Sequence, residues 1–259
     1  MAPNTPDHAG FPPYTFTKSF HHNLYPSIDP RNPLLSLHGK VVVITGGGRG
    51  IGKTIAKSFA IAGARAVILF GRTAATLEST AKDIESMGTD TLVKTFVVDI
   101  LVRKDLNQTM ESIQRDVGSV DIFINNAGDF YGGPIASCDL DEYWNSVSTN
   151  VLGSLNCIQA VLQYDRGSSQ AALTLINLST AGIHLPPYPN MSAYAASKLA
   201  AHTIMSYLQV EMSDSLRVFS IHPGTVPTDM AAKAGVPTAD DAGMLWASCC
   251  LVSRVCTFR

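Results

Sequence analysis

The sequence predicts one α/β domain with a doubly wound parallel sheet covered by helices on both faces. Short apolar runs rich in β-branched residues alternate along the chain with longer stretches of helical periodicity. A glycine-rich turn joins the first apolar run to the first helical stretch, and polar or glycine residues follow several later runs directly. Strands and helices that alternate in this way form right-handed crossovers between parallel neighbours. A chain of 259 residues fits one large domain of this kind.

The first strand and the first helix are predicted on either side of the glycines. Residues 41–45, VVVIT, form a continuous β-branched run, as expected for a strand buried on both faces of a parallel sheet. Apolar residues then recur at helical spacing from Ile51 to Ala62, and Gly63 ends the helix. Similar patterns predict strands at 66–70, 92–98, 120–125, 172–178 and 216–222, and helices at about 74–87, 104–117, 142–162 and 193–211.

Residues 1–38 are predicted as an N-terminal extension to the domain at 39–259. They are rich in proline, histidine and aromatic residues and show no sustained period. Both a flexible arm and a segment packed against the domain surface fit this composition. The aromatic residues favour packing.

Composition and charge exclude several classes of function. The net charge of −2 and the isoelectric point of about 6.4 give no basic surface for nucleic acid or an anionic membrane. No apolar run reaches the length of about 18 residues that a membrane span needs. The first residues lack the features of a secretory or mitochondrial leader, so we expect a soluble cytoplasmic protein. The five cysteines are odd in number and show no metal-ligand spacing, so we expect reduced thiols and no metal site.

The segment T-G-G-G-R-G-I-G at 45–52 predicts a binding site for the pyrophosphate of a dinucleotide. It lies between a buried strand and a helix, which is the context that such a site needs. Gly46 permits the tight turn, Gly50 lets the phosphates approach the backbone, and Gly52 allows close helix packing. The helix N-terminus supplies unpaired N–H groups to the phosphates, and Ile51 is counted among these cofactor-binding residues. An ordinary glycine-rich turn is the alternative.

Two arginines favour NADP(H) over NAD(H). An NAD-binding chain typically carries an acidic residue at the end of the second strand, where it binds the ribose 2′-hydroxyl. Here that position holds Gly71 and Arg72, and Arg49 lies inside the glycine-rich turn. Two guanidinium groups suit a 2′-phosphate through charge-assisted hydrogen bonds. The alternative is that both arginines are solvated surface residues.

Tyr194 and Lys198 predict a site of proton transfer. They lie one turn apart on one face of a predicted helix. The pKa of an unperturbed tyrosine, about 10, is too high for efficient proton exchange near neutral pH, and a lysine cation nearby favours the phenolate. A Tyr-x3-Lys pattern alone is weak. It gains force because Ser179 follows the strand just upstream and Asn150 adds a polar group in the preceding long helix.

In order and spacing, these motifs resemble the short-chain dehydrogenase/reductases of the Tyr-x3-Lys type, and the resemblance extends from Leu37 to Met230. It rests on TGGGRGIG at 45–52, Asp99, NNAG at 125–128, Asn150, Ser179, YAASK at 194–198 and HPGTVPT at 222–228. It implies a Rossmann-like fold and an NADP(H)-dependent enzyme that interconverts a ketone and a secondary alcohol.

The resemblance also implies a role for each residue. Ser179 would hold the substrate oxygen, and Tyr194 would deliver or remove its proton. Lys198 would lower the pKa of Tyr194 and bind the nicotinamide ribose, while the backbone carbonyl of Asn150 would anchor a water linking Lys198 to solvent. The other implied cofactor contacts are Asp99 at the adenine, Asn126 and Gly128 along the cofactor cleft, and Pro223, Gly224 and Thr228 at the nicotinamide end.

The chain departs from the family pattern in two places. The loop at 182–191, GIHLPPYPNM, carries three prolines, and we expect it to face the substrate. After HPGTVPT the family continues with a lid, a helix and a last strand. Here residues 239–252 have helical periodicity, and 253–259 are too short and too basic for a strand. We therefore expect a sheet without its last strand, in a chain less stable than its relatives that is truncated, mis-spliced or dependent on a partner subunit.

Two functions of different classes remain. The leading expectation is an oxidoreductase acting on a hydrophobic small molecule, similar to reductases of fungal secondary metabolism. It would be a homodimer or homotetramer paired through the helices that carry Asn150 and Tyr194. The alternative is a catalytically impaired, truncated nucleotide-binding relic or regulator of the same fold. A metal hydrolase is a distant third, because no His/carboxylate cluster has ligand spacing.

Overall fold

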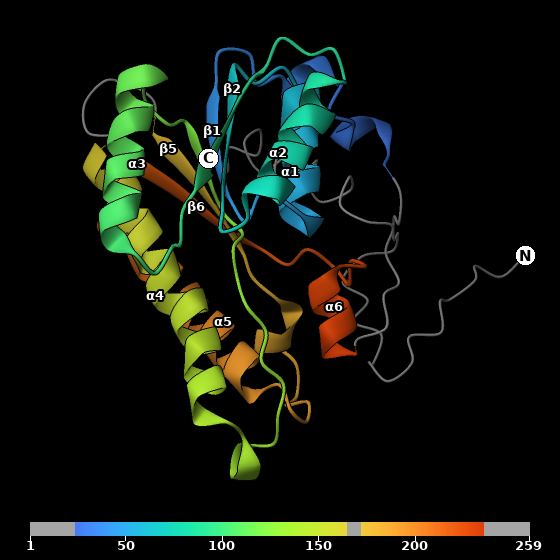
Figure 1. Ribbon diagram of the computed structural model, residues 1–259, viewed down its shortest axis with the longest axis vertical. Helices are drawn as coiled ribbons and strands as arrows, with labels where there is room; N and C mark the ends of the chain where they lie inside the picture. The colour runs from blue at the N-terminus through green and yellow to red at the C-terminus, as the bar shows by residue number, and fades with distance from the viewer. Residues whose placement is uncertain (1–23, 165–171, 236–259) are drawn as a thin grey trace, which may run out of the picture.

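The computed structural model describes residues 24–164 and 172–235, and within them six strands form one parallel sheet. The strand order is β3-β2-β1-β4-β5-β6, so the sheet grows in one direction from β1 to β3 and in the other from β4 to β6. Figure 1 labels β1, β2, β5 and β6 with the helices around them. The strands are β1 (Val41–Thr45), β2 (Ala66–Gly71), β3 (Leu92–Val97), β4 (Ile122–Asn125), β5 (Leu173–Leu178) and β6 (Leu216–Ile221). The reversal beside β1 is the topological switch point at which doubly wound sheets bind ligands.

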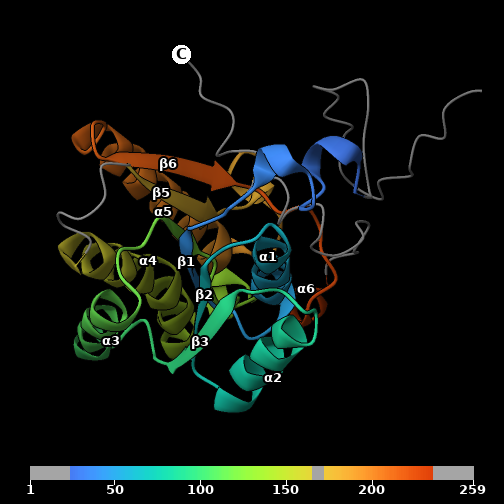
Figure 2. The same ribbon diagram turned by 90° about the horizontal axis from the view of Figure 1, so that it is seen from above.

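Helices cover both faces of the sheet. Figure 2 shows α1 and α2 on one face and α3, α4 and α5 on the other. The helices are α1 (Gly50–Ile61), α2 (Ala74–Glu85), α3 (Arg103–Asp116), α4 (Leu140–Tyr164), α5 (Ser192–Glu211) and α6 (Asp229–Ala234). Short 3-10 turns are η1 (Pro26–Ile28), η2 (Pro33–Leu35), η3 (Ile135–Ser137) and η4 (Ala181–Ile183).

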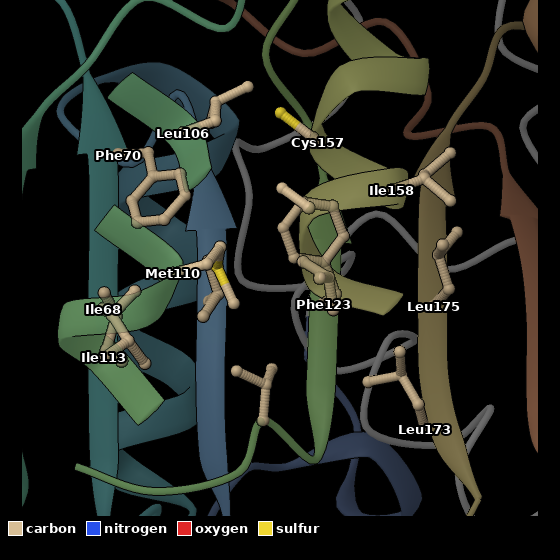
Figure 3. Close-up of a cluster of buried hydrophobic side chains, with 14 of the residues drawn as sticks. Ile68, Phe70, Leu106, Met110, Ile113, Phe123, Cys157, Ile158, Leu173 and Leu175 are labelled. Carbon is tan, nitrogen blue, oxygen red and sulfur yellow. The ribbon is translucent and has the colours of Figure 1, made fainter. Parts of the chain in front are cut away.

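The sheet separates two apolar cores, because its central strands are buried on both faces. Every residue of β1 is buried, and Ile44 pairs with Leu69 of β2 on one side and Ile124 of β4 on the other. Figure 3 shows the core between the sheet and helices α3 and α4. Its labelled side chains are Ile68, Phe70, Leu106, Met110, Ile113, Phe123, Cys157, Ile158, Leu173 and Leu175.

A row of polar side chains crosses the sheet near the carboxyl ends of its strands. Asn125 Nδ2 donates to Asn177 Oδ1 at 2.9 Å, and Asn177 Nδ2 donates to Ser220 Oγ at 3.4 Å. These residues are direct neighbours on β4, β5 and β6. Asn125 Nδ2 also donates to Ser154 Oγ of α4 at 2.9 Å. The row therefore ties the sheet to the helix that carries Asn150.

The predicted fold class is confirmed, and each predicted strand and helix within the described residues is present with small shifts at its ends. Helix α6 was missed, since residues 223–235 were treated as a loop. Two local signals mark it: Thr228 Oγ1 accepts a hydrogen bond from Ala231 N at 3.1 Å, and Gly235 ends the helix with φ 63°. The helix predicted at 239–252 lies outside the described residues.

Part of the predicted N-terminal extension packs into the domain. Ile28, Leu35 and Leu37 are buried, and Leu37 N donates to Ala62 O at 2.8 Å, just after α1. For residues 24–38 the packed alternative is therefore the one observed. Residues 1–23 lie outside the described part of the chain.

Candidate active site

The segments that carry the predicted site residues follow the carboxyl ends of the parallel strands, at one edge of the sheet. The glycine-rich turn follows β1, the NNAG segment follows β4, Ser179 follows β5, and the HPGTVPT segment follows β6. Helices α4 and α5 pack side by side and bring Asn150, Tyr194 and Lys198 to the same region. This edge is the usual ligand site of such folds.

The glycine-rich turn has the backbone geometry that phosphate binding requires. Gly46 and Gly50 adopt φ of 68° and 52°, which side chains disfavour. A Cβ on Gly52 would overlap Gly46 O and lie 2.6 Å from Asn126 Nδ2, so only glycine lets α1 begin this close to the turn. Ile51 is the second residue of α1, where N–H groups have no acceptor inside the helix.

Thr45 joins this turn to the NNAG segment. Its Oγ1 accepts hydrogen bonds from the N–H groups of Asn126 and Ala127, both at 2.9 Å, and donates to Ile124 O at 3.2 Å. Asn126 Nδ2 in turn donates to Thr45 O at 2.8 Å. Thr45 had no predicted role, although a hydroxyl at the end of an apolar strand is a signal for one.

The two arginines follow neighbouring strands, Arg49 in the turn after β1 and Arg72 directly after β2. Arg49 is the N-cap residue of α1, and its Nη1 lies 3.2 Å from Asp229 Oδ2. Arg72 follows β2 and is exposed, and it forms no ion pair with any other residue that the structure describes. Asp99 follows β3, and its Oδ1 accepts a hydrogen bond from Leu101 N at 2.9 Å, which fixes the side chain at its own turn.

Lys198 is buried next to Tyr194, which is half-buried. Lys198 is 9% exposed, and its Nζ lies 5.8 Å from the centroid of the Tyr194 ring. The same Nζ donates to Leu178 O at 2.8 Å, next to Ser179. The ring of Phe130 packs against Tyr194 with centroids 5.5 Å apart. Phe130 follows NNAG and was not singled out from the sequence.

Burial acts on the pKa of both groups. It raises the pKa of Tyr194 to about 12, and a hydrogen bond with the Thr180 side chain opposes part of that rise. It lowers the pKa of Lys198 to about 8. Desolvation of the phenol is the larger of these two causes, and the effect of Lys198 on the pKa of Tyr194 stays a prediction. Thr180, which had no predicted role, acts on Tyr194 directly.

Asn150 connects three segments through its side chain. Its Nδ2 donates to Asp129 O at 2.9 Å and to Ser197 Oγ at 2.8 Å, and its Oδ1 accepts from Asp129 N at 2.9 Å. Ser197 Oγ donates onward to Tyr194 O at 2.8 Å. The backbone O of Asn150 accepts from Ser154 Oγ at 2.7 Å. Ser197 lies inside the YAASK motif but was missed, since its role depends on contacts with α4.

Ser179 offers an unused hydroxyl. It is buried, and its Oγ has no hydrogen-bond partner among the described residues. Its backbone N donates to Ile221 O at 2.8 Å, which holds it against the end of β6. A buried polar group without a partner costs about 1–3 kcal/mol. A ligand oxygen that accepts from Ser179 would remove this penalty.

Two further close approaches involve glycines of the predicted site. A Cβ on Gly128 would lie 2.9 Å from Asn150 Oδ1 and 3.6 Å from Lys198 Nζ, so this residue leaves room beside the predicted catalytic groups. Beyond Pro223, Gly224 adopts φ 77° and turns the chain. Thr228 Cγ2 then comes within 3.3 Å of the place where a Cβ of Gly50 would stand. The segment after β6 therefore reaches the glycine-rich turn.

These residues fit a phosphorylated dinucleotide. The positive-φ glycines open the turn, two guanidinium groups lie beside it, and the unpartnered Ser179 hydroxyl lies at the far end with Lys198. Across the described ranges, no three His, Cys, Asp or Glu side chains are grouped to hold a metal ion. None of the helices described is both long and apolar enough to cross a membrane.

Comparison with known proteins gives matches along most of the chain. A sequence profile of the family described as short chain dehydrogenase matches residues 40–237. Short chain dehydrogenase tazN of Aspergillus terreus is 33% identical over 221 residues, 84% of this chain but 47% of tazN, so the chain spans about half of that relative. Short chain dehydrogenase pigC of Monascus ruber is 31% identical over 225 residues, covering 84% of this chain and 72% of pigC.

A solved structure matches as well. A short chain dehydrogenase from Shigella flexneri, determined in complex with NADP, superposes with a TM-score of 0.72 at 30% identity. The match covers 79% of this chain and 84% of that one. Fold, motifs and family match agree, and the chain belongs to the short-chain dehydrogenase family.

Proposed function

We propose that this protein is an NADP(H)-dependent oxidoreductase that interconverts a ketone and a secondary alcohol on a hydrophobic small molecule. The observation that carries the proposal is the unpartnered, buried Ser179 hydroxyl at the same strand end as Lys198, whose Nζ binds the adjoining Leu178 O. Tyr194 lies one turn before Lys198 on α5. A substrate oxygen bound there would have Ser179 as hydrogen-bond donor, Tyr194 as acid and Lys198 as a nearby cation.

The chain's own residues then bind, orient and protonate the substrate. NADPH held by the glycine-rich turn and the two arginines would supply the hydride that the carbonyl carbon gains. Ser179 Oγ donates a hydrogen bond to the carbonyl oxygen, and Tyr194 Oη gives that oxygen its proton as it becomes the alcohol. In the reverse direction Tyr194 takes the proton back. Phe130 packs on the tyrosine ring and limits its movement.

The pKa values of the free protein suit reduction. A Tyr194 pKa of about 12 keeps the phenol protonated at neutral pH, ready to act as an acid. A Lys198 pKa of about 8 leaves most of the lysine charged there, and this charge stabilises the phenolate that proton transfer leaves behind. Asn150 and Ser197 hold the tyrosine backbone in place through their hydrogen bonds.

The preference for NADP(H) rests on Arg49 and Arg72. Two exposed guanidinium groups lie at the turn after β1 and the end of β2, and no carboxylate follows β2. The NADP-bound Shigella structure supports the same choice. Arg72→Asp is expected to abolish or reverse the preference, which dissociation constants for NADPH and NADH would show. Equal constants in the wild type would refute it.

We also propose a homodimer or homotetramer and a role in secondary metabolism. The outer faces of α4 and α5 expose large apolar side chains, which a second copy of the chain would cover. The fungal origin of two relatives supports the metabolic setting.

The test is turnover by the purified chain. NADPH oxidation is followed against a panel of aliphatic, cyclic and aromatic ketones, with Tyr194→Phe as the matched inactive control. Turnover by the wild type that Tyr194→Phe loses would support the proposal. NADPH binding without turnover of any ketone would instead favour the alternative, a nucleotide-binding regulator.

A further inference from the structure

One ion pair joins the glycine-rich turn to the segment after β6. Arg49 Nη1 lies 3.2 Å from Asp229 Oδ2, although the two residues are 180 positions apart in the chain. Arg49 is the N-cap residue of α1, and Asp229 is the first residue of α6. The pair therefore links the start of α6 to the turn that is proposed to hold the cofactor.

Packing beneath the pair fixes its position. Thr228 Oγ1 accepts from Ala231 N at 3.1 Å and so sets where α6 begins. Thr228 Cγ2 lies only 3.3 Å from the place where a Cβ of Gly50 would stand. The start of α6 thus rests on the glycine-rich turn. This contact holds Asp229 next to residue 49 independently of the long arginine side chain.

The two arginines are consequently not equivalent. Arg49 has a carboxylate partner, whereas Arg72 makes no ion pair with any other described residue. A 2′-phosphate that binds Arg72 has no carboxylate of the described residues to compete with for the guanidinium group. At Arg49 the 2′-phosphate competes with the Asp229 carboxylate for the guanidinium group.

The geometry points to Asp229 as a specificity-determining residue, a resident counterion of Arg49 that limits how strongly NADP(H) is preferred over NAD(H). This inference rests on the proposed cofactor function. The ion pair stabilises the unliganded protein. NADP(H) binding loses that stabilisation because the 2′-phosphate takes its place, while NAD(H) has no such phosphate and leaves the pair intact.

The effect should be modest, because both side chains are largely exposed, 73% for Arg49 and 82% for Asp229. Exposed ion pairs change an equilibrium by up to about five-fold. Asp229→Asn should therefore tighten NADP⁺ binding about two- to five-fold at low ionic strength. The dissociation constant of NAD⁺ should stay unchanged. Added salt should shrink the difference, since it screens exposed charges.

The experiment is a double-mutant cycle measured by calorimetric titration with NADP⁺ and with NAD⁺. It compares the wild type, Asp229→Asn, Arg49→Met and the double variant. Asp214→Asn serves as the charge-matched control, because Asp214 is exposed in the turn before β6, at the opposite end of that strand. We expect Asp229→Asn to tighten NADP⁺ only while Arg49 is present, and Asp214→Asn to change neither constant.

The outcomes distinguish a failure of the proposed cofactor function from a failure of the role of Asp229. Equal wild-type constants for NADP⁺ and NAD⁺ would overturn the proposed cofactor function itself. A wild-type preference for NADP⁺ that Asp229→Asn leaves unaltered would overturn the role of Asp229 alone. Equal tightening with and without Arg49 would also overturn it, because the carboxylate would then act on the phosphate directly.

Discussion

At the residue scale, burial acts on the two titratable groups of α5 in opposite directions. It raises the pKa of Tyr194 to about 12 and lowers that of Lys198 to about 8. Each shift favours the neutral form of its own group. Within the described residues, Lys198 Nζ donates its hydrogen bond to the neutral Leu178 O and forms no ion pair, so no opposite charge offsets its desolvation. A buried lysine of this kind ties protein stability to pH.

Lys198 should make the protein more stable as the pH rises from about 7 to about 9.5. Its folded pKa, about 8, lies below the ordinary value of 10.5, so the unfolded chain holds more protons across this window. The free energy of unfolding should rise by about 2 kcal/mol relative to Lys198→Met, which has no group to titrate there. Urea unfolding of both proteins at several pH values measures the difference. A difference that does not change with pH would contradict the pKa shift.

Tyr194→Phe should lower turnover by about 10²–10⁴-fold, because it removes the proposed proton donor and keeps the ring that packs on Phe130. The dissociation constant of NADPH should stay near that of the wild type. Steady-state kinetics and fluorescence titration measure the two quantities. Unchanged turnover would show that another group transfers the proton.

At the element scale, the strands and long helices could be predicted because their signals are local. A β-branched run such as Val41–Thr45 and a closing residue such as Gly63 need no knowledge of the rest of the fold. Helix α6 was missed because six residues are too few to show a period. The roles of Thr180 and Ser197 could not be predicted, since each depends on partners that only the folded chain brings near.

Gly52→Ala should disturb the contact between α1 and the turn that precedes it. The added methyl group would overlap Gly46 O, and neither backbone can move freely. We expect a loss of about 1–3 kcal/mol in the free energy of unfolding, together with weaker NADPH binding. Gly182→Ala is the control, because its Cβ would meet Thr180 Oγ1 at an ordinary 3.5 Å. Chemical denaturation and titration of both variants test this; equal behaviour would contradict it.

At the scale of the whole molecule, α4 and α5 leave much apolar surface uncovered in the described chain. Six exposed large side chains lie on these two helices: Leu140, Trp144, Leu152, Leu199, Tyr207 and Val210. Single exposed apolar residues are common, but a concentration on two adjacent helices is typical of a surface that binds a partner. The proposed homo-oligomer would bury this surface.

The double variant Leu152→Asp/Leu199→Asp should be a monomer where the wild type is a dimer or tetramer. Two carboxylates buried at the interface would lack partners, which strongly disfavours association. Light scattering coupled to size-exclusion chromatography gives the mass directly. Leu34→Asp, which replaces an exposed apolar residue of η2, outside both helices, should leave the mass unchanged. A monomeric wild type would contradict the proposed assembly.

While the sheet assembles, Asn125 and Asn177 discriminate against mispaired intermediates. Strands β4 and β5 are buried along their whole length, so sliding one past the other by a residue still buries apolar side chains. A slip of β4 past β5 would separate Asn125 Nδ2 from Asn177 Oδ1, and a slip of β5 past β6 would separate Asn177 Nδ2 from Ser220 Oγ. Each amide left unpaired in the interior costs about 1–3 kcal/mol. The two asparagines thus disfavour a one-residue slip in strand register that burial of apolar side chains alone would not prevent.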